Sequence, residues 1–192
     1  MDHQDALRQV TAVCTAARAA FGAAAVSVAT VEPDGLRYVA ASGVGAGEIV
    51  GTVLPLERGL AGYVALSGRS MAVDRPADDP RFAADVARRT GLIPGSMLLV
   101  PVHDDVGDVI AVLSVLDRTA GATDALQTAA AFAELLASVL PGAIAALAAD
   151  GTTDGDAAGA AAAETLRQLR SLDPEVGRRA LGLIDDLLDV LT

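Results

Sequence analysis

Hydrophobic residues follow a helical spacing at the start of the chain and a strand-like pattern directly after it. Residues 4–21 carry one apolar stripe at intervals of three and four positions, and Gly22 stands where such a helix would end. The stripe consists of Ala6, Leu7, Val10, Val13, Cys14, Ala17 and Phe21. Residues 24–31 and 36–42 are apolar runs of strand length, and the Pro33-Asp34-Gly35 sequence between them is typical of a turn. The pattern predicts a helix followed by a β-hairpin.

Glycine and proline divide the middle of the chain into short predicted elements. Asp79 is placed to cap a helix and Pro80 to occupy its first position, so this helix would run to about Arg89 and end at Gly91. The other predicted elements are a flexible glycine-rich connection over 43–51, a strand over 52–56, a helix over 59–67 and a strand over 70–74.

Two near-continuous apolar runs, 96–103 and 108–117, predict a hairpin of central strands around a turn at 104–107. A long helix over 123–140 follows, which Pro141 is expected to bend or end. Its apolar residues cover nearly the whole circumference, namely Leu126, Ala129, Ala130, Phe132, Ala133, Leu135, Leu136, Val139 and Leu140. Because one sheet covers only one side of a helix, we expect a homodimer in which this helix and the first helix of two copies form a bundle.

The end of the chain differs in composition from the rest. We expect a domain over 4–148, a polar linker over 149–159 and a helical extension over 160–192. The second helix of the extension, over 174–191, carries an apolar stripe opposite Asp185, Asp186 and Asp189. We expect this helix to rest on its own chain or on the dimer mate and to present these aspartates to a basic partner protein. The alternative is a solvated acidic face that serves solubility.

The composition is that of a folded, acidic protein. Of the 192 residues, 52% are hydrophobic and 20% are charged, and the formal net charge is -11. Such a chain without a basic cluster would repel a phosphate backbone, so direct nucleic-acid binding is not expected. All 14 basic residues are arginine, which favours a GC-rich bacterial genome such as that of an actinobacterium. There is no signal-peptide pattern, and the longest uncharged run, 135–149, is shorter than the ~20 residues of a membrane span. We therefore expect a cytoplasmic protein that does not enter the membrane.

Few side chains offer catalytic or metal-binding chemistry. Cys14, the one cysteine, lies on the apolar stripe of the first helix and is expected to be a buried hydrophobe. His103 stands at a strand end without a second ligand at a suitable spacing, so a solvated imidazole is favoured over a metal or haem ligand. Asp74, Asp78 and Asp79 could be paired carboxylates for acid–base work, but capping and turn formation explain them better. We expect no metal and no enzymatic activity.

Four segments, in this order, resemble the GAF domain of small-molecule sensors. They are PLERGLAGYV at 55–64, DDPRF at 78–82, MLLVPV at 97–102 and VIAVLSVL at 109–116. The resemblance covers about residues 4–148. It implies an α+β fold in which an antiparallel sheet of five or six strands carries helices on both faces, but it does not identify a ligand.

The resemblance also implies a ligand pocket between the concave face of the sheet and the two middle helices. The residues that it implicates are Tyr38, Leu60, Tyr63, Val73, Asp74, Arg81, Phe82, Val86 and Leu98. The alternative is that Tyr63 and Phe82 simply fill the core. The sequence identifies neither a ligand nor a cofactor.

Three specialised kinds of GAF domain fit the sequence poorly. Those that bind cyclic nucleotides carry an Asn-Lys pair after the last strand, then Phe, and then Asp-Glu. The matching places here hold Asp117-Arg118, Ala120 and Asp124-Ala125. Those that reduce methionine sulfoxide need several cysteines, and those that bind bilins need one in the pocket region, which Cys14 does not supply.

We therefore expect a stand-alone, non-catalytic regulatory protein that senses a small molecule and acts through a separate output protein. The residues after Ala149 are too few to hold a kinase, cyclase, phosphodiesterase or DNA-binding domain. The alternative is a dimerisation or protein-interaction module without a ligand, and cyclic-nucleotide binding ranks below both.

Overall fold

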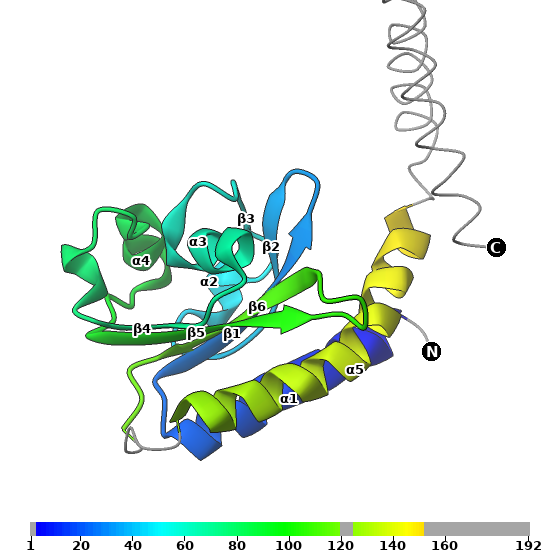
Figure 1. The fold of residues 1–192 in the computed structure, drawn as a ribbon, viewed down its shortest axis with the longest axis horizontal. Helices are drawn as coiled ribbons and strands as arrows, with labels where there is room; N and C mark the ends of the chain where they lie inside the picture. Colours follow the sequence, from blue (N-terminus) through cyan, green and yellow to red (C-terminus); the bar gives the residue numbers. More distant parts are fainter. Residues whose placement is uncertain (1–2, 120–124, 152–192) are drawn as a thin grey trace, which may run out of the picture. The chain divides into compact units, whose positions relative to one another are not determined.

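The structure, a computed structural model, describes residues 3–119 and 125–151 and contains one six-stranded sheet (Figure 1). In chain order the elements are α1 (His3–Phe21), β1 (Ala25–Glu32), β2 (Gly35–Gly43), α2 (Ala46–Ile49), β3 (Val53–Leu54), α3 (Gly59–Ser67), β4 (Met71–Asp74), a 3-10 turn η1 (Pro76–Asp78), α4 (Ala84–Thr90), β5 (Ser96–His103), β6 (Val109–Leu116) and α5 (Ala125–Gly151). The strand order is β3-β2-β1-β6-β5-β4, and all neighbours are antiparallel. The expected α+β fold is confirmed.

Helices cover both faces of the sheet. In Figure 1, α1 and α5 lie side by side against one face, whereas α2, α3 and α4 lie over the other. Each face has its own hydrophobic core. The strands supply both cores because successive side chains of a strand point to opposite faces. On β6, Leu113 and Val115 belong to the core of α1 and α5, whereas Val112 belongs to the core of the short helices.

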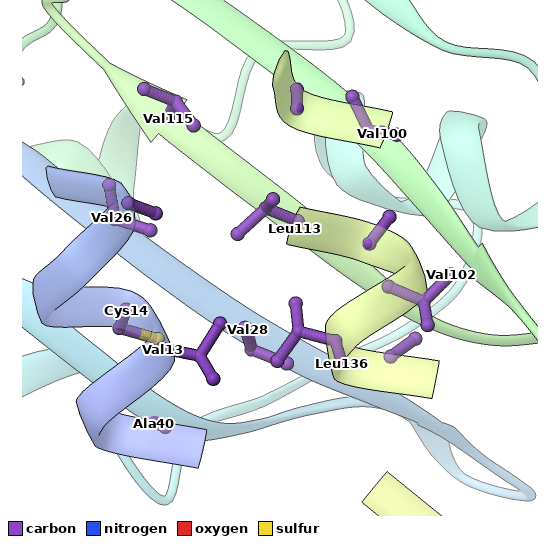
Figure 2. Packing of buried hydrophobic residues seen from close by; sticks show 14 of the residues in the cluster. Val13, Cys14, Val26, Val28, Ala40, Val100, Val102, Leu113, Val115 and Leu136 are labelled. Atoms are coloured by element: carbon purple, nitrogen blue, oxygen red, sulfur yellow. The ribbon is translucent and has the colours of Figure 1, made fainter. Parts of the chain in front are cut away.

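The core under α1 and α5 confirms the apolar stripe of the first helix. Cys14 is fully buried in this core, as expected. Figure 2 shows Val13 of α1 and Leu136 of α5 pointing toward each other above the sheet. Near the end of α1, the rings of Phe21 and Phe132 lie with their centroids 6.1 Å apart and join the two helices.

Helix α5 is less evenly apolar than its sequence suggested. Its buried side is formed by Ala125, Ala129, Ala133, Leu136 and Leu140. Gln127, Glu134 and Ser138 follow a helical spacing and form an exposed polar ridge. Leu126 is 52% exposed and Leu135 is 47% exposed, and they lie on opposite flanks of α5 because nine residues make two and a half turns. The sheet therefore leaves two apolar flanks exposed instead of a whole apolar face.

Pro141 lies inside α5 and does not end it. A proline removes one backbone hydrogen bond and crowds the preceding turn, which bends a helix, and the yellow end of α5 leaves the axis of its first part in Figure 1. Among the described residues, α5 is also the one helix long and apolar enough to cross a bilayer, over Ala125–Gly142. The buried residues of this segment pack on the sheet.

The helix expected to begin at Asp79 begins at Ala84 instead, in α4. The Asp79 carboxylate accepts a hydrogen bond from the backbone N–H of Arg81 at 2.9 Å, and the Asp79 carbonyl accepts one from the N–H of Phe82 at 2.9 Å. These bonds form a turn, so the Asp79 carboxylate that was expected to cap a helix is engaged in the turn instead. The predicted end of the helix is confirmed, because Gly91 adopts a left-handed φ of 71°.

The glycine-rich connection 43–51 is not wholly irregular, since it contains the short helix α2. Gly45, just before α2, has a φ of 73°, and a Cβ atom on it would lie 2.6 Å from the carbonyl oxygen of Thr90. Only glycine fits this close approach. Gly45 thus allows α2 to lie against the end of α4.

Several predictions fall on residues outside the described ranges. These are the extension over 160–192 with its helix at 174–191, the linker beyond residue 151, and the positions Ala120 and Asp124. They stay predictions.

Candidate functional site

A cavity of about 100 Å³ lies between the sheet and the helices α2, α3 and α4. Its described lining residues are Ala25, Val26, Ser27, Tyr38, Ala41, Val44, Gly45, Ile49, Leu54, Arg58, Gly59, Leu60, Ala61, Phe82, Ala83, Val86, Ala87, Thr90, Leu92, Pro94, Met97, Ser114 and Leu116. Most of these side chains are apolar. A cavity of this size holds several water molecules or one small organic molecule.

Small side chains on three neighbouring strands create this space. Ser27 of β1 pairs with Ser114 of β6 on one side and with Ala41 of β2 on the other, so the three form a row across the sheet. The row ends at Leu99 of β5, which pairs with Ser114 and is fully buried. A leucine within the row would fill the cavity, because protein interiors are packed closely.

Three hydroxyl groups on the cavity wall are buried. Relative exposure is 8% for Ser27, 4% for Ser114 and 9% for Tyr38. Within the part of the chain that the structure describes, no side-chain hydrogen bond satisfies these hydroxyls. A buried hydroxyl without a partner costs roughly 1–3 kcal/mol. Desolvation raises the pKa of Tyr38 from its ordinary value of 10.0 to about 12, so this hydroxyl stays protonated at neutral pH.

An ion pair stands at one side of the cavity. Arg58, the residue before α3, donates a hydrogen bond to the carboxylate of Asp85 in α4 at 2.7 Å. Both side chains are about half exposed, and the contact lowers the pKa of Asp85. Of the described lining residues, only Arg58 and Tyr38 are titratable. The arginine is already paired, so the cavity wall carries little uncompensated charge.

Four of the nine residues expected in the pocket line the cavity, namely Tyr38, Leu60, Phe82 and Val86. Val73 packs in the same core without reaching the cavity wall. Asp74 is exposed at the end of the edge strand β4. Leu98 lies in the core on the opposite face of the sheet, because its neighbours Met97 and Leu99 take the positions that face the short helices. The placement of Leu98 in this pocket is therefore wrong.

The two remaining residues, Tyr63 and Arg81, form an exposed cluster outside the cavity wall. The Arg81 guanidinium lies 4.3 Å from the centre of the Tyr63 ring, a cation–π distance. It also donates two hydrogen bonds to the Asp79 carboxylate, at 2.9 and 2.7 Å. These bonds lower the pKa of Asp79 to about 2. The arrangement stabilises the turn before α4 and holds Arg81 outside the cavity wall.

Ser27 and Ser114 were missed by the sequence reasoning. A single serine in an apolar strand is a weak signal, since nothing in the chain shows which serines share a face. A signal was present in the spacing: the positions 25, 27 and 29 alternate with the larger Val26 and Val28 and are all small. This alternation indicates a strand whose small side chains all point to one face and leave space there.

Few side chains near the cavity could serve in catalysis. Among the described residues, no group of three or more His, Cys, Asp or Glu side chains could hold a metal ion. Cys14 lies in the core on the other face, and burial raises the pKa of its thiol to about 12. The Asp117 carboxylate, at one of the positions where the sequence departs from the cyclic-nucleotide pattern described above, accepts hydrogen bonds from the N–H groups of Gly95 and Ser96 at 2.7 and 3.0 Å.

Comparisons with known proteins agree with this fold. The dual 3',5'-cyclic-AMP and -GMP phosphodiesterase 11 of Drosophila melanogaster is 35% identical over 63 residues, which cover 33% of this chain and only 4% of that protein. Two solved structures share the fold: the GAF domain of a phosphoenolpyruvate-protein phosphotransferase from Coxiella burnetii and a type II free methionine-R-sulfoxide reductase from Thermoplasma acidophilum. The first is 18% identical with a TM-score of 0.61 and covers 77% of this chain and 98% of that one. The second is 17% identical with a TM-score of 0.58 and covers 71% of this chain and 93% of that one.

A protein-family match also covers most of the chain. The GAF domain family matches residues 5–140, which include all but the first two residues of α1, every element from β1 to β6, and most of α5. Members of this family are sensory and regulatory modules that bind small molecules. The chain belongs to the GAF domain family.

Proposed function

We propose that this chain is a non-catalytic sensory module that binds a small molecule in the cavity between the sheet and α2, α3 and α4. The observation that carries the proposal is the set of three buried hydroxyls, from Ser27, Tyr38 and Ser114, on the wall of an otherwise apolar cavity. Ligand sites in proteins have this composition: apolar walls with a few polar groups that orient the ligand.

The absence of catalysis is supported by what surrounds the cavity. A methionine sulfoxide reductase shares this fold, but the buried thiol of Cys14 lies across the sheet from the cavity and is held in its unreactive protonated form. No described lining residue is a His, Cys, Asp or Glu that could serve as acid, base or metal ligand.

A cyclic nucleotide suits the cavity less well than a neutral ligand. A cyclic phosphate needs a cation or a cluster of free N–H groups, and Arg58, the one cation among the described lining residues, already pairs with Asp85. The likeness to a cyclic-nucleotide phosphodiesterase covers too little of that protein to outweigh this argument.

We further propose that the module works as a cytoplasmic homodimer and passes its state to a separate output protein, without contacting nucleic acid or membrane. The exposed apolar flanks of α5 and the exposed alanines of α1 support an interface along these helices. The negative net charge of the chain favours a partner protein with a basic surface and disfavours a nucleic acid. A dimerisation module without a ligand is the second candidate function, which the same exposed flanks support.

Native mass spectrometry of freshly purified protein, followed by a thermal-shift screen of nucleotides, amino acids and lipophilic metabolites, tests ligand sensing. A ligand that binds only the folded state raises the melting temperature. In the variant Ala41→Leu the added side chain fills the cavity and should abolish this shift, whereas Ala72→Leu, on an exposed position of β4, should preserve it. If no compound shifts the wild type, or if Ala41→Leu keeps the shift, ligand sensing in this cavity is refuted and the ligand-free module is favoured.

A further inference from the structure

We propose that the ligand is an uncharged molecule with a hydroxyl or amide group, which Ser27, Ser114 and Tyr38 bind, and with an apolar body that fills the rest of the cavity. This inference rests on the proposed function and specifies the chemistry of the same site. It assigns the two serines, which neither the sequence reasoning nor the family match singled out, as the residues that select the ligand.

The strand register places the two serines side by side. Ser27 and Ser114 are directly paired across β1 and β6, and the Cβ atoms of paired residues in an antiparallel sheet lie about 4.5–5.5 Å apart. Both side chains therefore reach the same polar atom of a ligand. Tyr38 joins them from β2, where it pairs with Ala29, two residues along β1 from Ser27. The three hydroxyls thus occupy adjacent strands on one face.

The burial of these groups indicates that they act in binding. Each of the three residues is more than nine-tenths buried and lines the cavity, and its hydroxyl has no hydrogen-bond partner among the described residues. Buried polar groups in folded proteins are almost always paired. A hydroxyl both donates and accepts, so three of them suit a ligand group that does the same, such as an alcohol, a phenol or an amide.

The charge of the site argues for a neutral ligand. Transfer of an ion into an apolar cavity is unfavourable unless a counter-charge accompanies it. Among the described residues of the wall, the one cation is Arg58, which is paired with Asp85 at the more exposed side of the site. No carboxylate is present among the described lining residues to hold a cationic ligand. The raised pKa of Tyr38 has the same cause, because burial disfavours the charged form of its hydroxyl.

The remaining wall determines the other end of the ligand. Leu60 and Ala61 of α3, Phe82, and Val86 of α4 contribute apolar contacts opposite the serines. The cavity of about 100 Å³ suits a body about the size of one ring. The ligand is thus amphipathic, with its polar end toward the sheet.

Three probes of one shape separate the alternatives: phenol, toluene and benzoate, which differ only in a hydroxyl, a methyl or a carboxylate on the same ring. Their effect on the melting temperature would be measured by differential scanning calorimetry for the full-length wild type and the double variant Ser27→Ala/Ser114→Ala. The matched control is Ser42→Ala, whose hydroxyl accepts hydrogen bonds from Thr15 and Arg18 of α1 on the opposite face.

We expect phenol to stabilise the wild type more than toluene does, and benzoate to have no effect. Each lost hydroxyl should weaken phenol binding roughly threefold to tenfold, the value of one neutral hydrogen bond, and leave toluene binding unchanged. Without probe, the double variant should melt no lower than wild type, because its two hydroxyls have no partner to lose, whereas Ser42→Ala should melt lower.

Three results would overturn the inference: benzoate binding as tightly as phenol, an unchanged preference for phenol in the double variant, or no binding by any probe. The last result would leave ligand sensing itself standing if the metabolite screen finds a compound that Ala41→Leu rejects. In that case the cavity binds a ligand of a different chemical class. Failure of both experiments would refute ligand sensing as well.

Discussion

The proposed homodimer makes a sharp prediction about two leucines on α5. Leu135 lies on the same flank of α5 as Phe132, which packs on Phe21 of α1, so this flank faces α1. Leu126 lies on the opposite flank, away from α1. The exposed alanines Ala12 and Ala16 complete what we call the α1–α5 seam, together with Leu135 and Ala131. We predict that Leu135→Glu abolishes the dimer and that Leu126→Glu does not.

The magnitude follows from the exposure of the side chains. Full burial of a leucine is worth about 1.5–3 kcal/mol, and Leu135 is 47% exposed, so dimerisation would gain roughly 1 kcal/mol from each copy. Loss of both copies across the two-fold axis weakens the dimer by about 2 kcal/mol, or roughly thirtyfold. Two glutamates facing each other in the interface add repulsion and desolvation, so the full effect should exceed this value.

Sedimentation at micromolar concentrations measures the dissociation constant of each variant, and thermal melting checks that the monomer remains folded. Glutamate and leucine have similar helix propensities, so both half-exposed substitutions should leave the fold intact. Leu136→Glu is a further control: this neighbour of Leu135 is fully buried, and its replacement by a charge should unfold the protein. A monomeric wild type, or equal weakening by Leu126→Glu and Leu135→Glu, would show that the seam is not the interface.

The remaining predictions concern single residues of the site and the core. Arg81→Ala should leave ligand affinity unchanged, because Arg81 pairs with Asp79 outside the cavity wall. The neighbouring Phe82→Ala should weaken ligand binding and lower the stability by roughly 2 kcal/mol, about half the cost for a fully buried ring. Equal ligand affinities of the two variants in titration calorimetry would contradict this prediction. The free energy of unfolding should fall by up to roughly 3 kcal/mol as the pH rises from 10 toward 12, because the unfolded chain loses the Tyr38 proton at a lower pH than the folded one does. In urea titrations, Tyr38→Phe should not show this part of the decrease. Cys14 should resist thiol reagents in the native protein and react in guanidinium, since the raised pKa lowers its thiolate fraction about a thousandfold; rapid native labelling would disprove its burial.

The fold was largely predictable because its signals are local and redundant. The helix 59–67 was predicted with the bounds that the structure gives, and the hairpin of β5 and β6 was predicted within one residue. Each of these elements combines an apolar period with a glycine at its start or in its turn. The start of α4 was predicted wrongly because an aspartate such as Asp79 can either cap a helix or stabilise a turn. Here the Asp79 carboxylate accepts hydrogen bonds from the backbone N–H and the side chain of Arg81, which favours the turn, and helix propensities do not include such a contact.

The site was only half predictable because it depends on strand pairing. Tyr38 and Phe82 were recognisable as aromatic residues near the expected pocket, and both line the cavity. Leu98 failed because a shift of one residue along a strand exchanges the two faces of the sheet. Ser27 and Ser114 are 87 residues apart in the chain and form a site only through the register of β1 with β6. No spacing in the sequence reports such a pairing.

The same two strands offer a route by which a ligand could affect the dimer. Ser27 lies between Val26 and Val28, and Ser114 lies between Leu113 and Val115, and these four apolar residues pack beneath α1 and α5 (Figure 2). The proposed ligand would therefore contact two strands whose other face supports the seam helices. Coupling between two binding events is reciprocal, so the factor by which phenol changes the dimer constant must equal the factor by which dimerisation changes phenol affinity. We predict that the monomeric Leu135→Glu binds phenol with an affinity different from that of the wild-type dimer, whereas Leu126→Glu matches the wild type. Titration calorimetry of the three proteins decides this, and identical affinities would mean that the cavity and the seam are energetically independent.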